Sequence, residues 1–211
     1  MESEDPDRPF VEAWRSGDNK AGHELFKRHF DDINGFIRRN VSDGSVEDLV
    51  QETFLQCQRS LANFAGRHTF RAYLYGIARN VLYDHLRKRH RRERLQDLLE
   101  RTLEELGASP LLMMAERQEV VLFGHALRRI PLDMQVLFQL HFWEKLPAPA
   151  LADIYDAPEG TIRSRIRRAK DLVRTKIVEL ASTPEELAST LSGFDTWAER
   201  VRQLDPRRLP D

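Results

Sequence analysis

The stretch "APALADIYDAPEGTIRSRIRRAKDLVR", residues 148–174, decides how the second half of this chain folds. Its pattern predicts a helix, a tight turn at Asp156 or Ala157, and a second helix with Pro158 at or near its first position. The apolar residues that recur at helical spacing in the second helix are Ile162, Ile166, Ala169, Val173 and Ile177. We therefore expect an amphipathic helix with one buried seam and one polar face.

The polar face of this second helix is strongly basic. Residues 158–170 hold five cations, and Glu159 is the acid among them. Arg165 lies near the apolar seam, so we expect it to pack or pair. The side chains on the outer face or its flank are Arg163, Ser164, Arg167 and Arg168. Helix-turn-helix proteins insert such a helix into the DNA major groove, where Arg and Ser can bond bases or phosphates. The alternative is a solvated basic helix without a partner.

Composition limits the class of protein. The 211 residues are enough for one or two domains with an apolar core. Cys57 is the single cysteine, which excludes a disulfide within the chain and fits a reducing compartment. The first ten residues are acidic and lack an apolar core, and no run reaches the roughly 18 apolar residues of a membrane span. We predict a soluble, cytoplasmic protein with no membrane insertion.

The net charge of −1 hides alternating blocks of opposite sign. Residues 71–94 contain eight Arg or Lys against two acids, a local charge of +6, and residues 158–176 contain seven against two, a local charge of +5. Residues 95–119 lie between them and carry six acids and two bases, a local charge of −4. Two basic segments separated by an acidic one predict two contacts with a polyanion, although each run alone could be a solvated face.

The rest of the chain is also predicted to be helical. The first helix covers residues 20–41, where the apolar face comprises Leu25, Phe26, His29, Phe30, Ile33, Phe36 and Ile37. A second helix begins at Val46, with Ser45 as cap and Asp48 completing a capping box. Its buried stripe leaves outside, among others, Asp48, Gln51, Glu52 and Leu55. His29 is expected to be a hydrogen-bonded core residue.

A long helix is predicted from about residue 70 to residue 92, after the loop "ANFAGRHT" of residues 62–69. Its predicted buried face comprises Phe70, Tyr73, Leu74, Ile77, Ala78 and Val81. The side chains predicted to point the other way are Ala72, Gly76, Arg79, Tyr83, Arg87 and His90, with Asn80 at the margin. The first domain is therefore expected to be a helical bundle that ends in a basic arm.

The fold class predicted from these patterns is all-α, with two helical domains and a short helical C-terminal extension. The predicted boundaries are residues 10–93 for the first domain, 94–115 for a linker, 116–180 for the helix-turn-helix domain and 181–211 for the extension. The second domain opens with two apolar helices divided at Pro131, a residue that suits a helix start. In the extension, Thr183, Pro184 and Glu186 predict a capped helix that either packs on the second domain or docks a partner.

Three motifs in this order resemble those of the sigma-70 family of bacterial transcription initiation factors. They are "EDLVQETFLQ" at residues 47–56, "TFRAYLYGIARNVLYDHLRKRHRR" at residues 69–92 and "PEGTIRSRIRRAK" at residues 158–170. The chain is most similar to the extracytoplasmic-function (ECF) group, which keeps only the second and fourth conserved sigma domains. The resemblance extends over roughly residues 21–176.

The resemblance implies a role for each motif. "EDLVQETF" corresponds to the surface that docks on core RNA polymerase, which assigns that contact to Asp48, Gln51, Glu52 and Leu55. The loop at residues 63–69 corresponds to the one that captures a base flipped from the promoter −10 element. Phe64 is a candidate wall for that base, and it can equally be a core residue.

The two basic helices correspond to the promoter-reading elements of the family. Candidates for the −10 contact are Arg79, Asn80, Tyr83, Arg87 and Lys88, with residues 88–92 on phosphates. Candidates for the −35 contact are the four outer-face residues of the basic helix that begins near Pro158, namely Arg163, Ser164, Arg167 and Arg168. The resemblance also implies an anti-sigma factor as a partner beside core RNA polymerase and promoter DNA.

Two rival functions differ in the features they require. A stand-alone helix-turn-helix regulator would bind duplex DNA but would not need "EDLVQETFLQ" or the basic segment at residues 71–94. A protein-interaction adaptor would need no DNA at all. We expect no enzyme, no cofactor and no metal, since neither a phosphate-binding glycine loop nor a nucleophile–base grouping nor metal-ligand spacing of the seven histidines is present.

Overall fold

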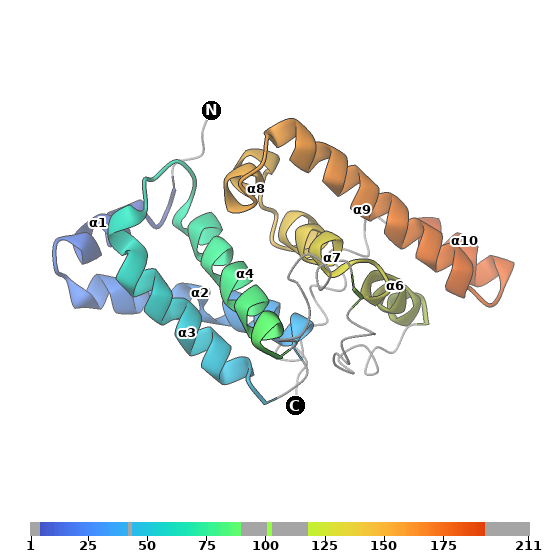
Figure 1. Cartoon of the computed structure of the whole chain (residues 1–211), viewed down its shortest axis with the longest axis horizontal. Coiled ribbons are helices and arrows are strands. Elements are labelled where there is room, and N and C mark those ends of the chain that lie inside the picture. Colours follow the sequence, from blue (N-terminus) through green and yellow to red (C-terminus); the bar gives the residue numbers. More distant parts are fainter. Residues whose placement is uncertain (1–4, 42–43, 90–100, 103–117, 193–211) are drawn as a thin grey trace. The chain divides into compact units, whose positions relative to one another are not determined.

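The computed structural model of the chain describes residues 5–41, 44–89, 101–102 and 118–192. In these ranges the regular structure is helical, as predicted, and the chain divides into two compact units, Met1–Arg89 and His90–Asp211 (Figure 1). The predicted linker lies largely outside the described residues. Its described part pairs within the second unit, where Thr102 bridges to Pro131 and the Leu132 amide donates to the Arg101 carbonyl at 2.8 Å.

The described part of the first unit contains the α-helices α1 (Arg8–Arg15), α2 (Asn19–Asn40), α3 (Val46–Ser60) and α4 (Phe70–Arg89), with a 3-10 turn at Leu61–Asn63 after α3. Helices α2, α3 and α4 pack on one another, and α1 packs on α2 (Figure 1). Asp18 caps α2 by accepting bonds from the amides of Lys20 and Ala21. Glycine is required at position 22, because a Cβ there would lie 2.6 Å from the Trp14 indole. This close approach holds α1 against α2.

Charged side chains fasten the beginning of the chain to this bundle. The predicted core role of His29 is confirmed, since its Nε2 lies 2.6 Å from Oδ2 of Asp7 and both residues are buried. Arg28 also donates to Asp7, at 3.3 Å. The first unit therefore includes residues that precede position 10, where the sequence predicted the domain to begin.

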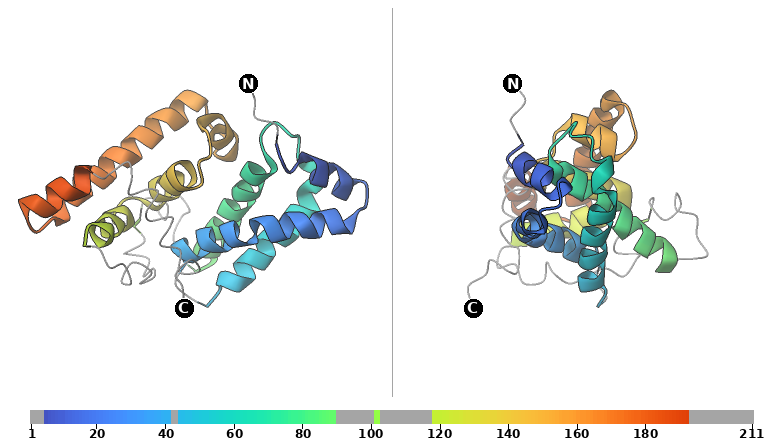
Figure 2. Two further views of the ribbon diagram at one scale, coloured as in Figure 1. Left: turned by 180° about the vertical axis from the view of Figure 1, so that it is seen from behind. Right: turned by 90° about the vertical axis from the view of Figure 1, so that its left-hand side faces the viewer.

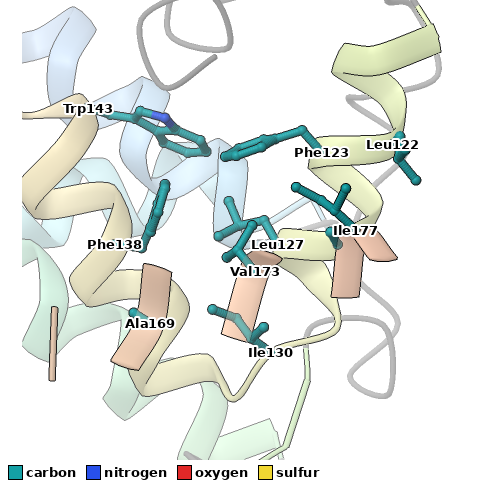
Figure 3. Close-up of a cluster of buried hydrophobic side chains, with 10 residues drawn as sticks. Leu122, Phe123, Leu127, Ile130, Phe138, Trp143, Ala169, Val173 and Ile177 are labelled. Atoms are coloured by element: carbon teal, nitrogen blue, oxygen red, sulfur yellow. The ribbon is translucent and has the colours of Figure 1, made fainter. Parts of the chain in front are cut away.

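The second unit contains helices α6 (Gln118–Arg128), α7 (Leu132–Phe138), α8 (Ala148–Ile154), α9 (Glu159–Leu180) and α10 (Pro184–Ser192), with a π-helical turn at Gln139–Trp143. Pro131 stands at the start of α7, as predicted. A core of aromatic and aliphatic side chains joins α6, α7 and α9, and Figure 3 shows Phe123, Phe138 and Trp143 facing Val173 and Ile177. One side of α9 packs on this core, and the opposite side of α9 faces solvent.

Helix α10 turns back along the end of α9 and also packs against α6 (Figure 2). Thr183 caps α10 as predicted, because the Glu186 amide donates to its Oγ1, but the Glu186 carboxylate accepts from the amide of Ser182, one residue before the cap, so the capping box is only half formed. Leu187 and Leu191 lie against the core of the second unit. The described part of the extension is thus packed. The stretch "GFDTWAERVRQL" at residues 193–204, for which the helical spacing of its apolar residues also predicts a helix, falls outside the described residues.

Two local predictions for α2 and α3 are wrong. Ser45 stands at the start of α3 but does not cap it with its side chain; its hydroxyl lies 3.4 Å from Nε2 of His85 instead. Phe30, predicted in the apolar face of α2, is 47% exposed. Its ring stacks on Phe54 of α3 with centroids 6.3 Å apart, so it borders the packed face without being buried in it.

Candidate nucleic-acid interface

The N-terminal half of α9 presents a basic surface. The outer-face residues Arg163, Ser164, Arg167 and Arg168 are all exposed. Ile162, Ala169, Val173 and Ile177 of the predicted seam are buried, and Ile166 is half-buried. The seam therefore fixes the rotation of the helix, and that rotation points the four polar residues to solvent.

Intramolecular partners neutralise only part of this surface. Glu159 accepts a bond from Nε of Arg163 at 2.7 Å, and Arg165 lies 3.9 Å from the Asp133 carboxylate, as its position near the seam predicted. Within the described part of the chain, Arg167 and Arg168 have no ion-pair partner. These two guanidinium groups are therefore available for an anionic ligand without loss of an internal pair.

A tight turn places α9 beside α8. The Ala157 amide donates to the Ala152 carbonyl at 3.0 Å, and Asp156 adopts a left-handed conformation with φ 46°. Asp is among the few non-glycine residues that adopt this region readily. Pro158 then begins α9 and accepts from the amides of Thr161 and Ile162. The predicted helix, turn and helix are confirmed, and the positive end of the α9 dipole lies next to the basic surface.

The second basic surface lies on the C-terminal half of α4. Asn80, Arg87 and Lys88 are exposed, and Arg87 pairs with Asp84 at 2.9 Å. Arg79 is half-buried, with its guanidinium 4.4 Å from the centroid of the Tyr83 ring. Residues 90–92 of the predicted basic arm lie outside the described residues.

Tyr83 does not point to solvent as the helical wheel predicted, since only 5% of it is exposed. Ala72 is buried on the same predicted outer face. The wheel assumed one buried face, whereas α4 is buried around most of its circumference, at Phe70, Ala72, Leu74, Tyr75, Ala78, Val81, Leu82, Tyr83 and Leu86. The exposed part of α4 is therefore narrower than expected.

The loop that precedes α4 turns its aromatic side chain inward. Phe64 is 8% exposed, and its ring centroid lies 5.1 Å from that of Tyr73 and 6.0 Å from that of Phe70. Of the two predicted roles for Phe64, the structure supports the core role. Asn63 and Arg67 are exposed in the same loop, so its outer surface is polar.

A groove lies between α2 and α3. It has a volume of about 690 Å³ and is lined by His23, Phe26, Lys27, Phe30, Asp31, Val50, Gln51, Phe54 and Leu55. Leu55, which is 45% exposed, and Phe30 place apolar surface at its border. Asp48 and Gln51 are also exposed, and half-buried Glu52 accepts a bond from Gln56 at 2.9 Å. Apolar anchors with polar side chains around them are typical of a protein-binding surface.

Comparison with known proteins identifies the family. A model of Sigma-70 region 2 matches residues 25–92, which include the loop, all of α4 and every groove residue except His23. The ECF RNA polymerase sigma-E factor of Haemophilus influenzae is 32% identical over 182 residues, covering 82% of this chain and 96% of the relative. The chain belongs to the ECF group of the sigma-70 family. The factor of the same description from Escherichia coli K12 is 31% identical over 183 residues, covering 82% of this chain and 95% of the relative.

Solved structures share the fold of this sigma factor. CnrH in complex with the cytosolic domain of CnrY aligns with a TM-score of 0.60 at 20% identity, covering 83% of this chain and 99% of that one. The sigma factor RpoE in complex with the anti-sigma factor NepR, from Bartonella quintana, aligns with a TM-score of 0.57 at 23% identity, covering 75% and 96%. These likenesses support the all-α, two-domain architecture.

The sequence did not reveal every part of the sigma factor's surface. The contribution of Phe30 to the groove was missed because its spacing matches the buried face of α2.

Among the described residues no cluster of three or more His, Cys, Asp or Glu side chains could hold a metal ion, and no helix is long and apolar enough to cross a membrane. Cys57 is fully buried, and this burial raises the pKa of its thiol to about 12.

Proposed function

We propose that this sigma factor binds core RNA polymerase through its first domain, directs it to a two-part promoter and helps to open DNA at the −10 element. Catalysis belongs to the polymerase, and the sigma factor acts with it in the cytoplasm. The observation that carries the proposal is the presence of three exposed surfaces, a partly apolar groove between α2 and α3 and two basic surfaces at the end of α4 and the start of α9. A stand-alone regulator needs only the last of them.

Core polymerase binds at the groove side of α3. Leu55 supplies an apolar anchor, while Asp48, Gln51 and Glu52 supply acceptors and charge around it. Removing apolar surface from water is the main favourable contribution to association, so a partially exposed leucine contributes more binding free energy than the polar groups around it. Truncation of Leu55 should therefore weaken polymerase binding more than truncation of Gln51.

Promoter DNA at the −10 element binds the end of α4 and the loop before it. Asn80, Arg87 and Lys88 are exposed and fit contacts to bases and phosphates. Arg79 can reach DNA if its guanidinium leaves the Tyr83 ring, so Tyr83 acts by orienting Arg79. Because Phe64 is turned inward, the polar outer surface of the loop receives the flipped base.

The −35 element binds the start of α9. Arg167 and Arg168 contact phosphate or guanine. The Ser164 hydroxyl donates to the Thr161 carbonyl at 2.8 Å and can still accept a bond from DNA. Arg163 must release the Glu159 carboxylate before it can bind DNA. The arginines without internal partners should thus contribute more to affinity than Arg163.

An anti-sigma factor is the remaining proposed partner. The two solved relatives named above were each determined with another protein bound, which supports a similar interaction here. The proposed domain boundaries remain residues 10–93, 94–115, 116–180 and 181–211, with the N-terminal residues from Asp5 added to the first domain.

The three surfaces can be tested separately in a reconstituted system. Leu55→Asp should abolish core polymerase binding and therefore all transcription. Arg87→Ala with Lys88→Ala should preserve polymerase binding but lower the rate of open-complex formation. Arg167→Ala with Arg168→Ala should weaken promoter binding and thereby lower transcription. A promoter whose −10 region is artificially opened should restore only part of that lost transcription. If Leu55→Asp binds core polymerase like the wild type, the proposed docking surface is incorrect.

A further inference from the structure

The beginning of the chain is fastened to α2 before it reaches α1. We call residues Asp5–Arg15 the N-terminal strap. Asp7 of the strap is buried against His29 and Arg28, which bond its carboxylate at 2.6 Å and 3.3 Å. Burial by itself raises the pKa of Asp7, but the hydrogen bonds and charges of His29 and Arg28 outweigh it, so the pKa lies below its ordinary value. The strap is thus held by an ionised carboxylate in a fixed position.

One end of the strap fixes the start of α4. The Phe70 amide donates to Oδ2 of Asp5 at 2.6 Å, and the Asp7 amide donates to Oδ1 of the same carboxylate at 3.2 Å. Phe70 is the first residue of α4 and follows directly after the loop that contains Phe64. A carboxylate at a helix N-terminus satisfies an otherwise unpaired amide and interacts well with the helix dipole.

The other end of the strap fixes the start of the same loop. Arg15 donates from Nη2 to the Leu61 carbonyl at 3.0 Å and from Nε at 3.3 Å, and Nη2 also donates to the Phe64 carbonyl. Its guanidinium lies over the Phe64 ring, 5.6 Å from the centroid. Arg15 therefore binds two carbonyls of the loop and the side chain that the loop buries.

We propose that Asp5 and Arg15 are positioning residues for promoter −10 recognition. The strap holds residues 61–70 at both ends. Tyr73 ties the same region to α3 through its hydroxyl, which lies 2.8 Å from the carbonyl oxygen and 2.6 Å from the hydroxyl of Ser60. The loop between these anchors contains Gly66 with φ 69°, a left-handed conformation that favours glycine. The anchors thereby set the position of the outer loop surface toward a flipped base. This inference rests on the proposed function of the loop.

The experiment measures base preference at the −10 element by holoenzyme reconstituted from core polymerase and the full chain. The rate of open-complex formation is compared between a promoter with the preferred base and the same promoter with each base substitution. Arg15→Ala should reduce this preference roughly tenfold, the scale of losing hydrogen bonds from a charged donor. Arg15→Lys keeps the charge but not the fork that spans two carbonyls, so its loss should be smaller. Asp5→Ala should lower the preference as well.

Arg8→Ala is the matched control, because Arg8 lies on the same helix and pairs with exposed Glu12, away from the loop. It should keep the wild-type preference. Core polymerase affinity and the helical circular dichroism signal are measured for every variant, so that a folding defect is recognised. If Arg15→Ala does not fold, Arg15→Lys and Asp5→Ala decide the question.

The outcomes separate the inference from the function on which it rests. If Arg67→Ala in the loop changes base preference but the Arg15 and Asp5 variants do not, the positioning role is refuted while the loop keeps its function. If no variant of the loop or strap alters base preference, the loop does not read the −10 element. A loss of transcription with unchanged base preference in the Arg15 variants would also overturn the positioning role, because it indicates a general structural effect.

Discussion

Removing Arg167 and Arg168 from α9 should change how promoter binding depends on salt. Arg167 and Arg168 are exposed and, within the described chain, are not neutralised by a carboxylate. Each arginine that contacts a phosphate releases condensed counterions from DNA when it binds. The double variant Arg167→Ala, Arg168→Ala should therefore bind promoter DNA less tightly and with a weaker salt dependence.

The expected magnitude follows from two lost phosphate contacts. Each contact contributes about 0.9 to the slope of log affinity against log salt concentration, so the double variant should lower the slope by about 1.8. A fourfold dilution of salt, from about 200 mM to about 50 mM, then strengthens wild-type binding about twelvefold more than it strengthens binding of the variant. Arg163→Ala should lower the slope less, because Glu159 already neutralises that guanidinium.

Fluorescence anisotropy of labelled promoter DNA with reconstituted holoenzyme, at four or five salt concentrations, measures this slope. Arg174→Ala is the matched control, since it removes one exposed charge from the same helix but ten residues beyond Ser164. The reasoning is refuted if the double variant keeps the wild-type slope, or if Arg174→Ala alone lowers the slope as much.

Three further predictions concern the packing of the two units. Gly22→Ala should destabilise the first unit by about 1–3 kcal/mol in thermal unfolding, because its Cβ would overlap the Trp14 indole. Ile177→Ala should destabilise the second unit by about 2–5 kcal/mol by leaving a cavity, measured by chemical denaturation. Asp7→Asn should destabilise the first unit at neutral pH. Because the folded-state pKa of Asp7 is lowered, the wild type has the higher free energy of unfolding at pH values above the unfolded-state pKa of about 4. This difference disappears as the pH falls through the folded-state pKa.

Each of these predictions has a control or a contrary result. Gly44→Ala meets no atom within 4 Å and should lack the steric penalty, so equal losses at positions 22 and 44 would contradict the steric explanation. Val178→Ala removes a side chain that is 54% exposed and should change stability by less than about 0.5 kcal/mol. For Asp7, a difference between wild type and variant that stays constant from pH 7 to pH 3 would show that its ionisation does not stabilise the fold.

Sequence periodicity predicted the parts of this sigma factor in which one helical face is buried. In α9 the apolar seam and the four outer polar residues follow the wheel, and Arg165 pairs as its place near the seam indicated. The same method failed for α4, because this helix is buried around most of its circumference and a wheel with one buried face misplaces Tyr83.

The N-terminal strap could not be predicted from periodicity at all. In the sequence Asp5 and Asp7 are two acids of an acidic start, whereas in the fold Asp5 accepts a bond from Phe70 and Asp7 bonds to His29 and Arg28. These partners are 21 to 65 residues away along the chain, and no local pattern links them. Phe30 is a related case, since only the position of α3 shows that its ring borders a groove.

The central claim is that this chain gives core RNA polymerase its promoter specificity. The most direct measurement is run-off transcription from genomic fragments with bacterial core polymerase, in the presence and absence of the chain. We expect discrete transcripts only when the chain is added, all starting downstream of one shared pair of −35 and −10 elements. Binding of the chain to those fragments without transcripts, and without association with core polymerase, would contradict it.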